Sequence, residues 1–378
     1  MNSSQKFDAL APHPVPLLIV GGGAAGLFAG CLAGERNLGA LILERKHKPG
    51  RKLLMCGNGR CNLTKDITPD EMLRDMGAPM TDFLAPALRS LPPSAIQTWF
   101  QRHNVPLKKM PDKRIFPRSE HASDVVHALT DALRDTGTSL CLNAPVTRII
   151  REQNGFRVET PHFSVAAHHV LLATGGVSYP KTGSVGDGQK FAKTLGHALI
   201  PYRPGLIGFV FNHPWITRHA GTTYETAVCR LFHKQRKVYE GTGQLDCESW
   251  GIGGAAAYNA SRFVARETLA NFELEWTVNN ETQRIASPKT RPLKEAIVTL
   301  GGIPLAEVDP TTMASRKCTN LFFAGEIMDI DGPTGGYNLT AAFATAARAV
   351  ASVTENMRCQ PSHSSHANKH SPASHRMC

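Results

Sequence analysis

The stretch Leu17-Leu18-Ile19-Val20-Gly21-Gly22-Gly23-Ala24-Ala25-Gly26 decides the fold of this chain. Its apolar half predicts a short buried strand, and the glycine spacing Gly21-x-Gly23-x-x-Gly26 predicts a tight turn into a helix over residues 27–32. A second apolar run over residues 38–43 follows and ends at Glu44. Because N–H groups at the start of such a helix attract a pyrophosphate, this order of elements predicts a dinucleotide site.

Glu44 indicates which dinucleotide the site would bind. A carboxylate at the end of the second strand accepts hydrogen bonds from both hydroxyls of an unphosphorylated ribose, which favours FAD or NAD over NADP. The loop over residues 49–64 follows directly and carries Arg51, Lys52 and Arg60 among its glycines. We expect this loop to wrap the phosphates and the inner edge of a flavin, so FAD is the predicted cofactor. A tight turn without a ligand would leave Glu44 unexplained.

Two segments far along the chain support a flavin. Ala173-Thr174-Gly175-Gly176 ends one apolar run, and Gly325-Glu326 ends another. Gly335-Gly336 then opens the last predicted helix, whose positive N-terminal end would stabilise negative charge on the pyrimidine of a reduced flavin. We expect Glu326 to bond the ribityl chain.

The remaining pattern predicts an α/β domain interrupted by a β-rich one. Helical pieces separated by prolines are expected within residues 68–104, and β-like runs dominate from residue 199 to 278. A polar, turn-rich stretch over residues 279–292 follows, and the Ser- and His-rich end from residue 356 is expected to be disordered. Other helices are predicted over residues 121–136, 186–195 and 339–353, and strands over residues 139–142, 146–150, 156–159, 163–166, 170–173, 206–211, 272–278 and 321–324.

Composition excludes several classes of protein. Hydrophobic residues make up 42% of the 378 residues and charged residues 19%, which is typical of a folded globular chain. No apolar stretch approaches the ~20 residues of a membrane-spanning helix, and the N-terminal stretch lacks the apolar core of a signal peptide. We therefore expect no membrane association and a cytoplasmic location, with the nine cysteines held as thiols.

The formal net charge of +11 invites a nucleic-acid partner. The sequence contains no Lys/Arg run with interleaved aromatic residues and no nucleic-acid-binding module. We therefore expect a small-molecule substrate and no nucleic acid, with the basic surface attracting anionic cofactors or substrates. The histidines offer no HExxH spacing and the cysteines no CxxC spacing, so no metal is predicted.

These motifs together resemble the BaiN/YhiN-like (HI0933-like) family of bacterial flavoproteins, which are NAD(P)/FAD-dependent oxidoreductases. The likeness spans residues 17–353 and is carried by residues 21–26, 50–64, 114–117, 173–188 and 323–338. The resemblance implies a discontinuous FAD-binding domain of Rossmann type, made of residues 15–195 and 315–355. A β-rich domain over residues 196–314 is inserted into it, and residues 1–14 and 356–378 are flexible tails.

The chain departs from the family pattern in two places. Only about a dozen polar residues, 279–290, stand where relatives carry a small helical insertion, so that insertion is largely missing. Cys247-Glu248-Ser249-Trp250 replaces the aromatic and histidine part of a family motif.

The candidate site residues combine the motifs with the resemblance. The residues expected to hold the cofactor are Gly21, Gly23, Ala24, Ala25, Gly26, Glu44, Arg45, Arg51, Lys52, Leu53, Gly57, Asn58, Gly59, Arg60, Asn62, Val146, Thr174, Gly175, Gly325, Glu326, Asp331, Gly335, Gly336, Asn338 and Leu339. The candidate catalytic residues are Arg60, Arg114, Tyr179 and Lys181, since a hydrogen-bond donor on a substrate carbonyl would stabilise a developing enolate.

Three chemistries remain open. Residues 182–188 look like the helix start of fumarate-reductase-type flavoproteins, which implies hydride transfer from NAD(P)H through the flavin to a conjugated C=C bond. Cys56 and Cys61, spaced Cys-x-x-x-x-Cys, fit a flavin disulfide reductase, although Gly57 and Gly59 would break the helical turn that positions such a pair. The third alternative is a non-catalytic FAD-binding redox sensor.

Overall fold

In a computed structural model, which describes residues 13–264 and 272–359, the glycine turn joins a central strand to a buried helix. Strand β1 (Val15–Val20) pairs in parallel with β2 (Ala40–Leu43) on one side and with β9 (Ser164–Leu172) on the other. Leu17, Leu18 and Ile19 have no exposed surface, as expected for a parallel strand covered on both faces. The predicted α/β class with a parallel Rossmann-like sheet is confirmed.

The main sheet has the order β6-β2-β1-β9-β8-β7, with β19 also paired to β9. The added strands are β6 (Ser139–Cys141), β7 (Arg148–Glu152), β8 (Gly155–Glu159) and β19 (Leu321–Phe323). The two strands predicted over residues 163–166 and 170–173 form a single strand, β9. His169 interrupts the apolar pattern, but its ring is buried and its Nδ1 bonds the carbonyl oxygen of Pro16, so the strand continues through it.

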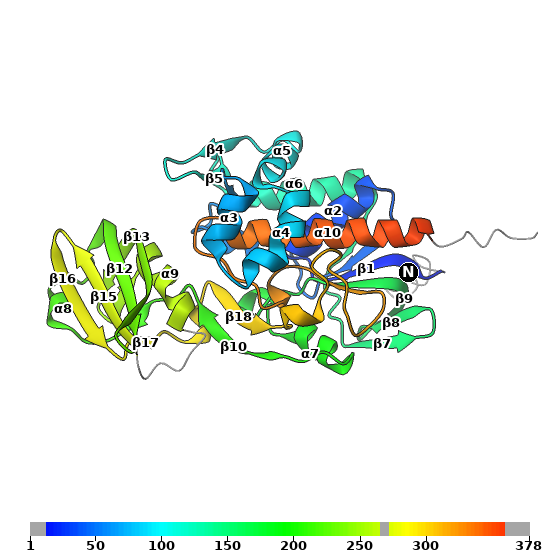
Figure 1. The fold of residues 1–378 in the computed structure, drawn as a ribbon. Coiled ribbons are helices and arrows are strands. Elements are labelled where there is room, and N and C mark those ends of the chain that lie inside the picture. Colours follow the sequence, from blue (N-terminus) through cyan, green and yellow to red (C-terminus); the bar gives the residue numbers. More distant parts are fainter. Residues whose placement is uncertain (1–12, 265–271, 360–378) are drawn as a thin grey trace, which may run out of the picture.

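Helices α2 (Ala24–Glu35) and α10 (Tyr337–Cys359) lie side by side although they come from opposite ends of the chain (Figure 1). Phe28 of α2 and Phe343 of α10 pack with ring centroids 4.9 Å apart. Helix α10 continues to Cys359, so the first residues of the predicted tail are helical; residues 360–378 lie outside the described residues. Other helices of this domain are α3 (Pro69–Met76), α4 (Met80–Ser90), α5 (Pro93–Arg102), α6 (Ala122–Asp135) and α7 (Asp187–Thr194).

A second, antiparallel sheet forms the domain at the left of Figure 1. Its core contains Trp276, Phe209 and Leu274, all fully buried, and helix α9 (Gly254–Val264) packs against it. Its strands and remaining helix are β11 (Phe209–Val210), α8 (Pro214–His219), β12 (Thr223–His233), β13 (Arg236–Glu248), β14 (Gly251–Gly253), β15 (Phe272–Val278), β16 (Glu281–Ala286) and β17 (Lys289–Thr290). The predicted second domain is therefore present.

The sequence missed several features of this second domain. Helices α8 and α9 lie in the stretch expected to be β-rich, and the polar stretch 279–292 contains β16 and β17. Strand β16 is mostly exposed and has no buried residue, so its side chains did not need the apolar alternation that marks a strand. Only Phe209–Val210 of the strand predicted over residues 206–211 is extended in the sheet.

The two domains are joined by short elements and a buried ion pair. Strands β10 (Ile200–Gly205) and β18 (Val298–Gly302) form a two-stranded sheet between them. Arg262 of α9 donates from Nε to Asp331 Oδ2 of the first domain at 2.6 Å. Ile303 and Val308 pack with the first core, so the second core lies within the narrower stretch from Phe209 to Ile285. A small sheet of β3 (Thr64–Lys65), β4 (Leu107–Lys109) and β5 (Arg114–Pro117) completes the first domain.

Candidate active site

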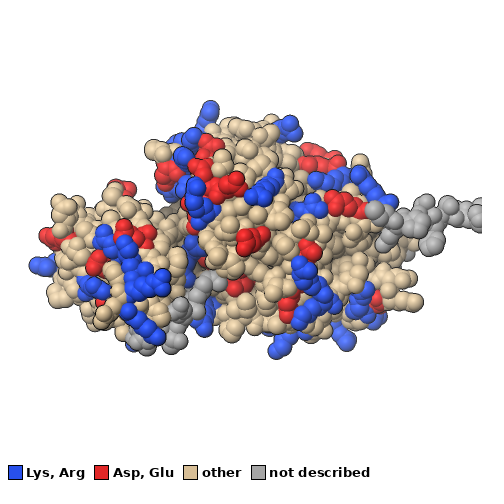
Figure 2. Space-filling view, in the orientation of Figure 1, with Lys and Arg blue, Asp and Glu red and all other residues tan. Residues whose placement is uncertain are grey.

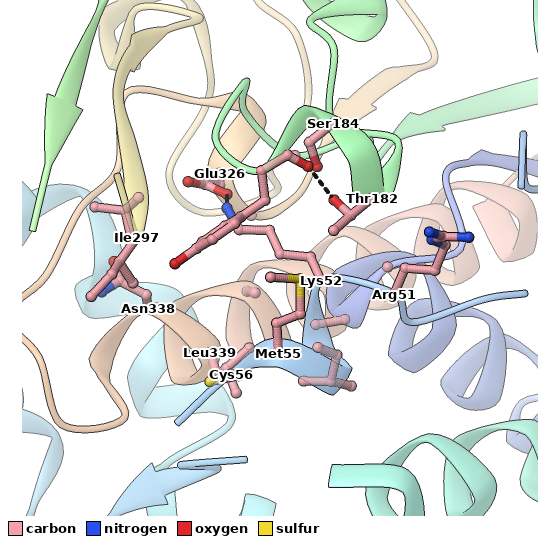
Figure 3. Close-up of a pocket in the computed structure, with 18 of the residues that line it drawn as sticks. Arg51, Lys52, Met55, Cys56, Thr182, Ser184, Ile297, Glu326, Asn338 and Leu339 are labelled. Atoms are coloured by element: carbon pink, nitrogen blue, oxygen red, sulfur yellow. Dashed lines mark hydrogen bonds and ion pairs between the residues drawn. The ribbon is translucent and has the colours of Figure 1, made fainter. Parts of the chain in front are cut away.

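A cavity of about 640 Å³ opens where the carboxyl end of the main sheet meets the second domain. Its walls come from the glycine turn, the loop after β2, the loop after β9, the start of α10 and the second domain. Figure 3 shows the residues that the loop after β2, the segment after β9 and the start of α10 contribute. Because ligands of open α/β sheets bind at the carboxyl ends of the strands, the cavity lies where the fold places a cofactor. We call it the interdomain cavity.

The glycine turn forms a cradle at one end of this cavity. A Cβ atom added to Gly23 would meet no other atom within 4 Å, so the space over this residue is open. A Cβ atom on Gly26 would lie 1.8 Å from the carbonyl oxygen of Gly21, so this glycine lets α2 cross β1 closely. Among the described residues, the N–H groups of Ala24 and Ala25 have no acceptor, and both residues line the cavity. These features fit a bound pyrophosphate.

Glu44 is fixed at the end of β2. Its Oε2 accepts a hydrogen bond of 2.7 Å from the N–H of Gly22, and its Oε1 accepts one of 2.7 Å from the N–H of Lys46. The residue is 9% exposed and lines the cavity beside the cradle. A carboxylate held in this way keeps lone pairs for the hydroxyls of a ribose.

Lys52 crosses the cavity and meets Glu326 (Figure 3). Its Nζ donates to Glu326 Oε2 and to Ser178 Oγ, each at 2.6 Å. The other carboxylate oxygen of Glu326 accepts from the N–H of Thr299 at 2.7 Å. The pair is only partly exposed, so its charges are compensated at close range inside the wall. The expected bond from Glu326 to a ribityl chain would add to these contacts.

Cys56 and Cys61 lie in the loop after β2 as free thiols. Cys56 lines the cavity, whereas Cys61 has no exposed surface. A hydrogen bond from the Cys61 thiol lowers the pKa of Cys56, with help from the N–H of Asn62 and the charge of Lys52, while the same interaction and burial raise the pKa of Cys61. The arrangement makes Cys56 the more reactive thiol of the pair.

Tyr179 combines an unusual backbone with a place in the cavity wall. Its φ of 52° and ψ of 58° lie in the left-handed region, which is rare for a bulky side chain. Burial raises the pKa of this phenol, and Tyr258 and Cys56 add to the shift, so these residues from separate segments lie near one another. A phenol with a raised pKa stays protonated and can donate a proton or a hydrogen bond.

Two arginines lie against one aromatic ring in the cavity. The guanidinium carbons of Arg60 and Arg114 are 5.0 and 5.6 Å from the centroid of Phe116. Arg114 also donates from Nε to Asp112 at 2.5 Å, and Arg60 donates from Nε to the carbonyl oxygen of Gly57 at 3.3 Å. Their positive charges therefore line the same wall as the loop expected to contact a flavin.

The structure brings most of the predicted site residues to one cavity. All the candidate cofactor residues except Gly26, Gly59 and Asp331 line it, as do Arg60, Arg114 and Tyr179. Lys181 is exposed and lies outside the lining, and Gly26 serves the crossing of α2 and β1. Asp331 is fully buried in its ion pair with Arg262, a contact that gives it a place at the domain junction rather than in the cavity.

The sequence did not identify the wall that the second domain contributes. This wall includes Gln244, Asp246, Trp250, Tyr258, Arg291, Glu295 and Ile297. These residues come from strands, a helix and turns that are far apart in the chain, and no local motif marks them. The replacement of the family pattern around Trp250 was the one signal that pointed to this region.

Two negative findings concern the described residues. Within residues 13–264 and 272–359, no helix combines the length and apolar character needed to cross a bilayer. In the same part of the chain, no group of three or more His, Cys, Asp or Glu residues is placed to hold a metal ion.

The family model described as the HI0933-like protein Rossmann domain matches residues 15–352. The chain is 26% identical to the ribosomal RNA dihydrouridine synthase of Escherichia coli, covering 90% of this chain and 96% of that protein. It is also 26% identical to the 3-dehydro-bile acid delta(4,6)-reductase of Clostridium scindens, covering 86% of this chain and 96% of the relative.

Solved structures share the fold at lower identity. A 3-ketosteroid-delta4-(5alpha)-dehydrogenase from Rhodococcus jostii is 14% identical, with a TM-score of 0.54 over 90% of this chain and 97% of that one. The FrdA subunit of E. coli quinol fumarate reductase is 14% identical, with a TM-score of 0.56 over 92% of this chain and 71% of that one.

Proposed function

Because the chain belongs to the HI0933-like Rossmann-domain family, and is thus an FAD-dependent oxidoreductase, we propose that it reduces a C=C bond conjugated with a carbonyl group in a small organic substrate. NAD(P)H is the proposed electron donor. The FAD, when bound, supplies hydride transfer.

The observation that carries this proposal is the continuity of the interdomain cavity. Its cradle and Glu44 suit the adenine end of FAD, and Lys52 and Glu326 line the same cavity. The second domain lines the same cavity, so we infer that one space receives both the cofactor and a second molecule. Its volume of about 640 Å³ is in the range of ligand pockets.

The names of the curated relatives support this class of reaction. One relative forms dihydrouridine and the other is a delta(4,6)-reductase of a 3-dehydro bile acid. In each case a C=C bond conjugated with a carbonyl group gains hydrogen. A conjugated carbonyl is thus the chemical feature that we carry over to this chain.

We propose separate roles for the residues that line the cavity. Lys52 and the N-terminal end of α10, at Asn338 and Leu339, would hold negative charge on the flavin pyrimidine. Tyr179 would donate the proton that the substrate's α-carbon requires, because its phenol stays protonated at neutral pH. Arg60 and Arg114, which both lie against Phe116, would bind phosphate or substrate oxygens.

A second candidate substrate is a uracil base in ribosomal RNA. The match to ribosomal RNA dihydrouridine synthases and the net charge of +11 favour it. Figure 2 shows Lys and Arg side chains interspersed with Asp and Glu over the visible face, without one continuous basic surface. On the second sheet, Arg230 pairs with Glu240 and Glu275. We therefore place the small conjugated ketone first.

The decisive experiment is an anaerobic two-step titration of the FAD-loaded protein. NADH and NADPH are added first, and bleaching of the flavin absorbance reports hydride uptake. A 3-oxo-4,6-diene steroid or an unmodified ribosomal RNA transcript is then added, and return of the yellow colour with a product two mass units heavier identifies the acceptor. A flavin that is bleached but reoxidised by neither compound would refute the proposed reaction. A flavin untouched by both nucleotides would refute NAD(P)H as donor.

A further inference from the structure

Arg291 is held rigidly in the wall that the second domain contributes to the interdomain cavity. Its guanidinium carbon lies 4.5 Å from the centroid of the Trp250 ring. Its Nε donates to Glu295 Oε2 at 2.5 Å, and its backbone N–H donates to the carbonyl oxygen of Gly208 at 3.1 Å. All four residues line the cavity. A guanidinium stacked on an indole and bonded to a carboxylate has little rotational freedom.

Trp250 is itself fixed from behind by Gly208. A Cβ atom on Gly208 would lie 2.5 Å from the Trp250 ring, so the indole packs directly on the backbone of this glycine. The close approach leaves no room for the ring to move toward Gly208. The Trp250 ring therefore offers the Arg291 guanidinium a fixed surface to pack against.

The guanidinium keeps donors available for a ligand. Arginine has five N–H donors, and the bond to Glu295 uses one of them. Across residues 13–264 and 272–359, no other side-chain hydrogen bond or ion pair of Arg291 is found. The terminal nitrogens thus remain free to bind an oxygen atom in the cavity.

The segment that follows Arg291 contains residues that bond to Ser178 and Glu326, which lie where the flavin is expected. Ile297 lines the cavity, and its carbonyl oxygen accepts from Ser178 Oγ at 3.4 Å. Thr299 then donates its N–H to Glu326, which pairs with Lys52. Figure 3 shows Ile297 facing the same space as Glu326 and Lys52. Arg291 and the Lys52–Glu326 pair are thus connected by one short segment of the wall.

We propose that Arg291 binds the carbonyl oxygen of the substrate and stabilises the negative charge that develops on it. This inference rests on the proposed reduction of a conjugated C=C bond. In that reaction the β-carbon of the substrate gains a hydride, the π electrons of the C=C bond move to form an enolate, and its charge lies on the carbonyl oxygen. The α-carbon then gains a proton, the enolate collapses to the carbonyl, and the flavin is oxidised by two electrons. A preorganised guanidinium on that oxygen lowers the barrier to hydride transfer.

Glu295 and Trp250 are positioning residues in this arrangement. Neither needs to touch the substrate, since their contacts set the plane of the guanidinium. A lysine at position 291 would keep the charge but lose the planar stack and the fixed fork of donors. Arg291→Lys is therefore expected to recover only part of the binding.

The test uses a stable mimic of the enolate, so it requires no turnover. The 4-chlorophenolate ion is planar and carries its charge on oxygen, and stacking on an oxidised flavin produces a long-wavelength charge-transfer band. Titration of the FAD-loaded protein at a pH above the pKa of the phenol gives a Kd from this band. The variants are Arg291→Ala, Arg291→Lys and Glu295→Gln, with Lys294→Ala as matched control because Lys294 is exposed on the same turn and lies outside the cavity lining.

We expect Arg291→Ala to weaken the Kd at least tenfold, Arg291→Lys and Glu295→Gln to weaken it less, and Lys294→Ala to leave it unchanged. The flavin content and the thermal midpoint of each variant are measured in parallel, so that a loss of folding is not counted as a loss of binding. Equal Kd values for Arg291→Ala and the unaltered protein would overturn the proposal, as would the absence of a band in the unaltered holoprotein. Failure of the proposed reaction itself appears separately, as a flavin that no conjugated ketone reoxidises.

Discussion

Substitution of Gly23 by valine separates cofactor binding from folding. Gly23 is the N-cap of α2 with a φ of −87°, which any residue can adopt, and no atom lies within 4 Å of an added Cβ. The bond from the N–H of Leu27 to its carbonyl oxygen is formed by the backbone and would persist. We therefore expect the flavin-free variant to fold, with a loss of at most about 1 kcal/mol from the poorer N-cap.

The cost to FAD binding follows from the open space over Gly23. A valine side chain there would hold a phosphate away from the N–H groups of Ala24 and Ala25. Each hydrogen bond to a charged group contributes about 1.5–3 kcal/mol, so losing both costs about 3–6 kcal/mol. This corresponds to a Kd weaker by about 10²- to 10⁴-fold.

The assay measures the FAD-to-protein ratio after purification and the Kd of the flavin-free protein for FAD by fluorescence quenching. Gly23→Ala is the graded control, since its single methyl group should produce a smaller loss. Gly26→Ala is the contrasting control, because its Cβ would lie 1.8 Å from the Gly21 carbonyl oxygen and should disrupt folding itself. A Gly23→Val protein that retains its full flavin content would show that the pyrophosphate does not lie in this cradle.

Three further predictions follow from the contacts described above. In flavin-free protein, iodoacetamide should modify Cys56 before Cys61, and at a lower pH than an ordinary thiol requires, as peptide mass spectrometry would show. Cys56→Ser should leave flavin reduction by NAD(P)H intact. A loss of that reduction in the variant would instead favour the disulfide-reductase alternative. Burial lowers the pKa of His197 and outweighs the raising effect of Glu307, so stability should fall as pH drops below about 6.5. His197→Gln should flatten part of this pH dependence in thermal melts. An unchanged slope of the thermal midpoint against pH would contradict the prediction. Asp331→Ala should lower the free energy of unfolding in urea by about 3–5 kcal/mol, because it leaves the Arg262 charge buried and unpaired. The double variant Arg262→Met with Asp331→Leu should recover much of this loss. Equal losses of stability in the single and the double variant would refute the reasoning.

The sequence predicted those parts of the fold that short segments determine. The segment from Leu17 to Glu44 is contiguous and contains the strand, the glycine turn, the helix and the acid. The spacing of its glycines and the place of its acid are the pattern that a dinucleotide-binding turn requires. The predicted strand over residues 272–278 is β15 itself, because one of its faces is buried and the other is partly exposed, which produces a regular alternation. Local patterns of this kind need no knowledge of the partner strands.

The parts that the sequence did not predict depend on distant contacts. Two strands were predicted where β9 is continuous, and the buried His169 in the gap between them bonds the carbonyl oxygen of Pro16, which is distant in the sequence. Asp331 stands in a glycine-rich segment next to the cofactor motif, yet Arg262 from the second domain determines its role. The Trp250–Arg291 stack combines residues from two separate connecting segments that share no local pattern.

The division of the cavity between the two domains explains how one fold can accept different substrates. The groups expected to hold FAD belong to the first domain, where the cradle and the Lys52–Glu326 pair line one cavity. Another part of the wall comes from the second domain, where the sequence led us to expect a departure from the family pattern at Cys247–Trp250. Changes there alter the shape offered to a substrate without disturbing the cofactor. Substrate choice in this chain should therefore follow the wall around Trp250 and Arg291, while the reaction class follows the first domain.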